Sequence, residues 1–272
     1  MSAVTTNAEP APADLHVQFE RVHMAFGRRV VFEAISCGFS RRQISVILGG
    51  SGSGKSTMLR LIGGLIRPQS GRVVVDGQDV SALPERRLYD VRQRIGMMFQ
   101  AGALLDSMSV FDNIAFPLRE HTSLGEKEIA DEVHARLQAV GLSSDVDRLL
   151  PNQLSSGMVR RVGLARAIIR RPSLLLCDEP FSGLDPASTK RIEGLLRRIN
   201  EDFDITVIVV SHHIPSTMRM ADRVVMLLPW GIVEGTPAEL VRSRDRRIVD
   251  FLNEDEGPQD TEKSGSIASA RS

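Results

Sequence analysis

The most informative segment of this chain is Gly49-Gly50-Ser51-Gly52-Ser53-Gly54-Lys55-Ser56. It follows an apolar run from Ile44 to Leu48 and precedes another that starts at Met58. This order of strand, glycine-rich turn and helix start completes the G-x-x-x-x-G-K-[ST] pattern, in which backbone N–H groups surround an anion at a helix N-terminus. The pattern predicts a phosphate-binding loop rather than a turn that binds nothing. Lys55 is expected at the β- and γ-phosphates and the Ser56 hydroxyl at Mg²⁺.

The composition is that of an ordinary globular protein without a dominant charge. The 272 residues are 42% hydrophobic and 25% charged, which allows a large core in one or two domains. Lysine plus arginine and aspartate plus glutamate number 34 each, so no net field draws the chain to nucleic acid, and we expect no nucleic-acid partner. Cys37 and Cys177 lie far apart in apolar runs, which favours buried free thiols over a disulfide.

No segment has the character of a secretory signal or a membrane span. Residues 1–14 are rich in Ala, Pro and Thr, lack a basic start followed by an apolar stretch, and are predicted to be disordered. The longest apolar run, Ile205 to Val210, is far shorter than the roughly 20 residues of a membrane span and predicts a buried strand. We therefore expect a chain that is soluble by itself and acts at a membrane only through a partner.

The hydrophobic pattern changes along the chain in a way that indicates an α/β fold. Alternating segments from Leu15 to Arg42 predict antiparallel strands, and residues 97–170 predict mostly helices. Further along, strands are predicted at 174–177, 205–210 and 224–228, with a helix at 187–200. This alternation predicts a parallel sheet with helices on both faces. Residues 253–272 form a polar tail that is predicted to be disordered or ordered by a partner.

An acidic pair, Asp178 and Glu179, follows the predicted strand at 174–177. A carboxylate at the end of a strand beside a phosphate loop is placed to hold Mg²⁺, usually through water, and this fits Asp178. Glu179 is placed to polarise a water for in-line attack on the γ-phosphate. An acidic pair that caps a surface turn is the competing interpretation, and the phosphate loop earlier in the chain favours the catalytic one.

A second helix start is marked by Leu154-Ser155-Ser156-Gly157-Met158. Ser155 stands where an N-cap belongs, and small residues let a phosphate approach a helix N-terminus closely. Taken alone, this segment is better explained as an ordinary helix cap.

In this order the motifs resemble those of the ATP-binding cassette (ABC) ATPases, from about Leu15 to about Leu252. The segment at 154–158 is similar to the family signature L-S-G-G-Q, with Ser156 in place of a glycine and Met158 in place of glutamine. The resemblance implies an α/β P-loop NTPase fold of the ABC ATPase type. Its parts would be a RecA-like parallel-sheet core, an N-terminal antiparallel β subdomain and an inserted helical subdomain at about 101–170. It also implies ATP and Mg²⁺ as cofactors.

The resemblance implies roles for further residues. Gln100 is similar to the glutamine that touches Mg²⁺ and senses the transport subunit, and Asp185 to an aspartate that bridges to the opposing subunit. His212 resembles the switch histidine near the γ-phosphate. Phe26 resembles the aromatic that stacks on adenine, for which Phe19 is the rival. The expected site comprises Glu179, His212 and Gln100 for catalysis; Phe26, Gly49, Gly50, Ser51, Gly52, Ser53, Gly54, Lys55, Ser56 and Thr57 for the nucleotide; Ser56, Gln100 and Asp178 for Mg²⁺; and Leu154, Ser155, Ser156, Gly157 and Met158 acting on a second subunit's nucleotide.

One region resembles a particular branch of the family. Residues 99–104 and 117–122 look like the F-Q-x-G-A-L and P-L-R-E-H-T segments of the Mla/Mce lipid-transport ATPases, which often carry Met at the position of Met158. This implies a homodimer of ATPase subunits at the cytoplasmic face of the inner membrane. Its partners would be an integral-membrane permease, Mce-type subunits and small accessory subunits, and its task phospholipid transport between inner and outer membranes.

Three other functions stay open. An ABC importer or exporter for another solute shares the nucleotide chemistry and differs only after Gln100. A non-transport ABC protein would carry two cassettes or long coiled coils, and this sequence shows one cassette and no sustained heptads. A P-loop kinase leaves the signature helix and His212 unexplained and ranks last.

Overall fold

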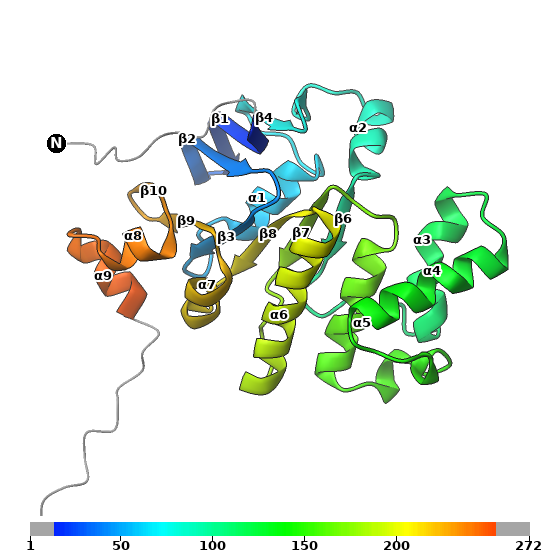
Figure 1. The fold of residues 1–272 in the computed structure, drawn as a ribbon. Helices are drawn as coiled ribbons and strands as arrows, with labels where there is room; N and C mark the ends of the chain where they lie inside the picture. Colours follow the sequence, from blue (N-terminus) through cyan, green and yellow to red (C-terminus); the bar gives the residue numbers. More distant parts are fainter. Residues whose placement is uncertain (1–13, 254–272) are drawn as a thin grey trace, which may run out of the picture.

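The computed structural model describes residues 14–253, which form two sheets with helices packed around them (Figure 1). The tail predicted at 253–272 and the disordered segment predicted at 1–14 lie outside the described residues, apart from Asn253 and Asp14. Asn253 is the last residue of a helix. The Asp14 carbonyl accepts a hydrogen bond from the Arg41 N–H at 3.0 Å.

The smaller sheet is antiparallel, as the alternating N-terminal pattern predicted. Its order is β2-β1-β4-β5. The strands are β1 (Leu15–Phe26), β2 (Arg29–Ser40), β4 (Ser70–Val75) and β5 (Gln78–Asp79). Phe19 in β1 packs edge-on against Phe39 in β2, with ring centroids 6.3 Å apart, so the buried face of this sheet is apolar.

The larger sheet has the order β10-β9-β3-β8-β7-β6. Its strands are β3 (Ile44–Gly49), β6 (Ile95–Met98), β7 (Leu174–Asp178), β8 (Thr206–Ser211), β9 (Arg223–Leu228) and β10 (Gly231–Gly235). All neighbours pair in parallel except β9 and β10. Leu48 is level with Ser211, and Asp178 with Val210. The carboxyl ends of β3, β7 and β8 therefore meet at one edge, where ligands of open α/β sheets bind.

Helices cover both faces of this sheet and form a separate group at one end (Figure 1). The α-helices are α1 (Lys55–Ile62), α2 (Glu85–Arg92), α3 (Val110–His121), α4 (Glu126–Ala139), α5 (Ser156–Ile168), α6 (Pro186–Phe203), α7 (Ile214–Met220), α8 (Pro237–Val241) and α9 (Arg246–Asn253). Two short 3₁₀-helices are η2 (Ser144–Val146) and η3 (Pro151–Gln153). Residues 101–170 contain helices and loops and no strand. In Figure 1, α3, α4 and α5 form the green group at the right.

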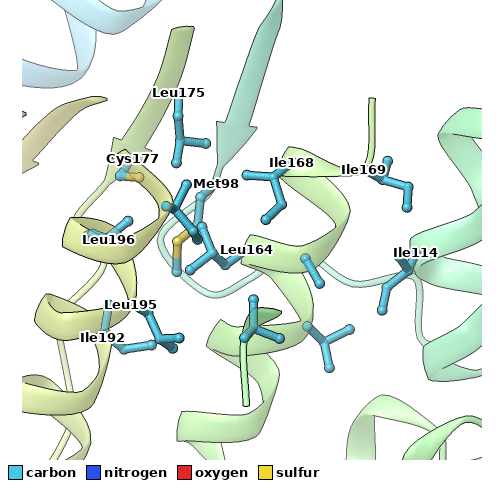
Figure 2. Packing of buried hydrophobic residues seen from close by; sticks show 14 of the residues in the cluster. Met98, Ile114, Leu164, Ile168, Ile169, Leu175, Cys177, Ile192, Leu195 and Leu196 are labelled. Carbon is cyan, nitrogen blue, oxygen red and sulfur yellow. The ribbon is translucent and has the colours of Figure 1, made fainter. Parts of the chain in front are cut away.

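The parallel sheet is buried on both faces. Alternate residues of β8 belong to different apolar clusters: Val207 and Val209 face the cluster with α3, α5 and α6, and Ile208 and Val210 face the cluster with α1 and the antiparallel sheet. Figure 2 shows the first cluster, in which side chains from α5 and α6 close over Cys177 and its neighbours. This two-sided burial explains the continuous apolar runs of the parallel strands.

Cys37 and Cys177 are free and buried, as predicted. Within residues 14–253, no helix is both long enough and apolar enough to cross a membrane.

Candidate functional site

The glycine-rich loop joins β3 to α1, as the motif predicted. Gly54 is the N-cap of α1 with φ 103°, and a Cβ on it would come within 2.7 Å of the Phe32 and Val31 side chains. Gly52 also has positive φ, at 76°. Only glycine adopts these conformations without strain, so the loop can curl tightly in front of the helix N-terminus.

A cavity of about 650 Å³ opens in front of this loop. Its walls come from the ends of β1, β6, β7 and β8, from the start of β2, and from the glycine-rich loop and the start of α1. The cavity gathers ten of the residues predicted for the site: Phe26, Ser51, Gly52, Gly54, Lys55, Ser56, Thr57, Gln100, Glu179 and His212. Its size suits a nucleotide. Four other predicted residues, Gly49, Gly50, Ser53 and Asp178, are not among the residues that line this cavity.

Lys55 brings a buried positive charge to the loop. Its Nζ donates hydrogen bonds to the Gly49 carbonyl at 2.7 Å and the Gly50 carbonyl at 3.0 Å, and it lies 4.0 Å from a Glu179 carboxylate oxygen. Burial lowers the pKa of Lys55, and the carboxylates of Glu179 and Asp178 oppose that shift. A buried ammonium held by carbonyl dipoles, beside the backbone N–H groups of a helix N-terminus, is an environment that attracts phosphate.

Ser56 and Asp178 form the part of the site suited to a divalent cation. The Ser56 hydroxyl donates to Asp178 Oδ1 at 3.3 Å. Burial raises the pKa of Asp178, and the Ser56 hydrogen bond opposes this. These oxygens, with the Gln100 amide in the same cavity, are of the kind that Mg²⁺ prefers. Within residues 14–253, no group of three or more His, Cys, Asp or Glu is arranged so that it could hold a metal ion, so a Mg²⁺ ion here would take further ligands from phosphate and water.

Glu179 and His212 form a hydrogen-bonded pair in the cavity. His212 Nδ1 and Glu179 Oε2 are 2.9 Å apart. Glu179 has φ 47°, a left-handed conformation that costs a non-glycine residue about 1–2 kcal/mol. Its N–H donates to the Val210 carbonyl at 2.9 Å, which fixes this bend directly after β7. An acid held by a neighbouring histidine is the arrangement expected of a positioned general base.

The two candidate aromatic residues of β1 occupy different environments. Phe26 ends the strand, lines the cavity and is 47% exposed, whereas Phe19 is 1% exposed in the core. Only Phe26 can offer a ring face to a ligand in this cavity.

The signature residues and Asp185 do not line the cavity of their own chain. Ser155 is the N-cap of α5 and accepts from the Met158 N–H at 3.3 Å. Asp185 is the N-cap of α6 and accepts from the Ala187 and Ser188 N–H groups at 2.9 Å each. A Cβ on Gly157 would lie 3.2 Å from Ser188 Oγ, so the starts of α5 and α6 lie side by side. These residues form a second surface, distinct from the cavity.

Two residues near the site were missed from the sequence. Arg29 lines the cavity and donates to the Gly52 carbonyl at 2.9 Å. Its only sequence signal is a position three residues after Phe26 on the same hairpin. His213 caps α7 by accepting from the Ser216 N–H at 3.2 Å and packs against Phe181, with ring centroids 6.2 Å apart. No role for His213 could be predicted from the sequence, because the fold determines that it contacts Ser216 and Phe181.

Together, the fold and the cavity define a nucleotide-binding ATPase cassette. The ABC transporter family model matches residues 32–182. The chain is 45% identical, over 85% of its length and 88% of the relative's, to the intermembrane phospholipid transport system ATP-binding protein MlaF of Haemophilus influenzae. The chain therefore belongs to the ABC transporter family, as its motifs predicted.

Other relatives agree with this membership. MlaF of Escherichia coli K12 is 42% identical over 87% of this chain and 88% of that protein. The probable ribonucleotide transport ATP-binding protein mkl of Mycobacterium leprae is 39% identical over 89% of this chain and 70% of that protein.

Solved structures confirm the expected ABC ATPase fold. The ATP-binding cassette MJ0796, a dimer in a post-hydrolysis state bound to ADP and Pi, matches with a TM-score of 0.74 and 29% identity, over 81% of this chain and 98% of that one. The cbiO1 subunit of the cbiONQ transporter from Clostridium perfringens matches with a TM-score of 0.78 and 26% identity, over 88% and 95% of the two chains.

Proposed function

We propose that this chain is the ATP-hydrolysing subunit of an ABC transporter that moves phospholipid between the inner and outer membranes through a separate permease. The observation that carries the hydrolytic part is the Glu179–His212 pair in the wall of a phosphate-loop cavity. The phospholipid part is supported by identity to the two MlaF proteins over most of both chains. The nucleotide-binding domain spans 15–252, with a helical subdomain at about 101–170.

Each residue of the cavity has a role in such a reaction. The loop N–H groups and Lys55 bind the triphosphate and balance its charge, and Phe26 packs on the adenine. Ser56, Asp178 and Gln100 would hold Mg²⁺, which supplies charge neutralisation at the phosphates when bound. Glu179 orients the attacking water and takes its proton, while His212 holds the carboxylate toward the γ-phosphate. Positioning and charge balance account for most of the catalysis in phosphoryl transfer.

The surface formed by residues 154–158 and Asp185 supports a dimer in which each chain completes its partner's site. Ser155 caps a helix whose N-terminus favours anions, yet it does not line the nucleotide cavity of its own chain. A two-fold pair would bring it to the partner's γ-phosphate, and the dimeric MJ0796 cassette is a precedent for such pairing. ATP would then stabilise the closed pair, and hydrolysis would release it.

The permease would dock in a groove directly after Gln100. This second cavity, of about 440 Å³, is lined by large apolar residues, which include Met97, Phe99, Leu105 and Phe116, and by polar ones: Arg92, Gln93, His121, Arg166 and Arg170. Phe99, Leu105 and Phe116 are exposed, which is unusual for a cluster of large apolar side chains. A docked permease would place the chain at the cytoplasmic face of the inner membrane. Mce-type and accessory subunits stay predictions from the resemblance.

A variant of the proposed base tests the hydrolytic mechanism. Glu179→Gln keeps the size of the side chain but cannot accept the proton, so kcat for ATP should fall by about 10²-fold or more. The same variant should accumulate an ATP-bound dimer in size-exclusion chromatography. Glu20→Gln, which changes a partly buried residue paired with Arg72 in the antiparallel sheet, is the control and should keep the wild-type rate. Wild-type turnover by Glu179→Gln would show that another group is the base.

A transporter for a different solute is the second candidate, because the mycobacterial relatives carry a ribonucleotide-transport name. Purification of the chain from native membranes with its permease, followed by mass spectrometry of bound small molecules, separates the two. Co-purified phospholipid supports the proposal, and a bound nucleoside without lipid supports the alternative.

A further inference from the structure

Arg166, near the end of α5, forms two hydrogen bonds to the loop that follows Gln100. Its Nη2 donates to the Gly102 carbonyl at 2.8 Å and its Nη1 to the Ala103 carbonyl at 2.9 Å. No ion pair of Arg166 occurs within the part of the chain that the structure describes. The planar guanidinium thus donates from both terminal nitrogens to two consecutive backbone carbonyls. Lysine cannot reproduce this paired geometry, because its charge is a single ammonium.

The Gly102 carbonyl ends the turn that carries Gln100, and the Ala103 carbonyl follows directly after it. β6 stops at Met98, and the Gly102 N–H donates to the Phe99 carbonyl at 2.9 Å, which closes a four-residue turn. Gln100 is the second residue of that turn. One side of the turn is fixed by the sheet, and the other side is fixed by Arg166. Gly102 and Ala103 have φ values of 76° and 45°, so the backbone that Arg166 holds is in a conformation that alanine rarely adopts.

The same turn lies directly on the backbone of α5. A Cβ on Gly163 would be 3.0 Å from the Gly102 Cα, and a Cβ on Gly102 would be 2.8 Å from Val159 Cγ1. Val159, Gly163 and Arg166 are spaced four and three residues apart, so they lie on one face of the helix. The turn packs against that face of α5.

We propose that Arg166 is a positioning residue that sets the place of the Gln100 amide in the nucleotide cavity. It acts through the Gly102 and Ala103 carbonyls and touches no reacting atom. The inference rests on the proposed function, because the place of Gln100 matters only if the cavity binds Mg²⁺ and ATP. Arg166 also lines the groove assigned to the permease, so a docked segment would lie against the residue that fixes Gln100.

A double-mutant cycle on the full chain tests this role. We expect Arg166→Ala to lower kcat about tenfold, as a small displacement of a positioned group does, and to raise the Mg²⁺ concentration needed for half-maximal rate at saturating ATP. Gln100→Ala should show both effects. If Arg166 acts through Gln100, the double variant is no slower than Gln100→Ala alone. Arg166→Lys should recover only part of the rate, because it offers no paired donors.

Two further variants keep the test decisive. Gly163→Ala leaves the guanidinium in place but pushes Gly102 away by a few tenths of an ångström, so it should reproduce the Mg²⁺ effect even if Arg166→Ala folds poorly. Arg197→Ala is the control: Arg197 lies on α6, away from the cavity, donates to the Met220 carbonyl of α7 at 2.6 Å and pairs with Asp222 at 3.4 Å. Its effects should multiply with those of Gln100→Ala.

The outcomes divide as follows. The positioning role would be overturned if the double variant lost the product of the two single losses in kcat. It would also be overturned if Arg166→Ala and Gly163→Ala kept the wild-type Mg²⁺ dependence. In both cases, hydrolysis by the wild-type chain would still support the proposed function. Absence of ATP hydrolysis by the wild-type chain would overturn both.

Discussion

Glu179 shows what the sequence can and cannot predict for a single residue. Its place after a buried strand and a phosphate loop predicts a carboxylate near the γ-phosphate. Its left-handed backbone and its contact with His212 could not be predicted, because both depend on the neighbouring strand β8. Arg29 could not be predicted either, since an arginine in a hairpin is usually a solvated charge. The motif identifies the residue types, and the sheet edge determines how they meet.

Arg29 leads to a prediction about ATP affinity. Its guanidinium lies in the cavity on the Gly52 carbonyl, where a polyphosphate would add an anionic neighbour. Arg29→Ala should raise the KM for ATP about fivefold, which corresponds to roughly 1 kcal/mol for an exposed charge contact, and leave kcat within about twofold. Steady-state ATPase measurements check this. Arg28→Ala, next to it but outside the cavity, should match the wild type; a fall in kcat with unchanged KM for Arg29→Ala would contradict the expectation.

At the scale of elements, the least predictable part is the segment between β6 and α3. Residues 97–170 were predicted to be mostly helical, and α3, α4 and α5 agree, but Met97 and Met98 belong to β6 and residues 99–109 are a loop. Asn113 holds the end of this loop: its amide accepts from the Leu105 N–H at 2.7 Å and donates to the carbonyls of Leu105, Met108 and Ser109 at 3.0–3.1 Å. Hydrophobic periodicity carries no information about a loop whose backbone is satisfied by buried side chains.

Asn113 is therefore expected to be important for stability. It is fully buried, and its removal would take away the hydrogen bonds that its side chain makes to the Leu105 N–H and the Met108 carbonyl, whereas the Leu105 and Ser109 carbonyls keep backbone donors. Asn113→Ala should lower the free energy of unfolding by about 2–4 kcal/mol, measured by urea denaturation. Asn152→Ala, an exposed asparagine in η3 of the same helical region, should change it by less than about 0.5 kcal/mol. Equal effects of the two substitutions would show that the Asn113 hydrogen bonds add little.

At the scale of the whole molecule, the two sheets are joined by contacts between residues far apart in the sequence. His16 in β1 lies 2.7 Å, through Nδ1, from the Thr206 hydroxyl at the start of β8. The same hydroxyl oxygen accepts from the Arg42 N–H at 2.8 Å, so its proton is free to point at His16. The presence of both sheets could be predicted from their patterns. The polar junction between them could not, because a lone histidine in an alternating strand carries no specific signal.

This junction makes folding stability depend on pH. Burial lowers the pKa of His16 from 6.5 to about 4, with the nearby Arg41 acting in the same direction. The unfolded chain then binds the proton more readily than the folded one, so stability is present above pH 6.5 and is lost as the pH falls toward 4, by about 3 kcal/mol. Urea denaturation at several pH values should show this loss in the wild type and not in His16→Gln. Parallel pH profiles for the two proteins would contradict it.

The two buried thiols offer a way to monitor the unfolding of each sheet separately. Cys177 lies in an interior strand of the parallel sheet and Cys37 in the antiparallel one, and burial raises the pKa of both. An alkylating reagent attacks the thiolate, so neither cysteine should react until its own sheet opens. The labelling rate of each cysteine thus reports the opening of the sheet in which it lies. Mass spectrometry of partly labelled protein would show which cysteine is alkylated first, and therefore which of the two sheets opens first.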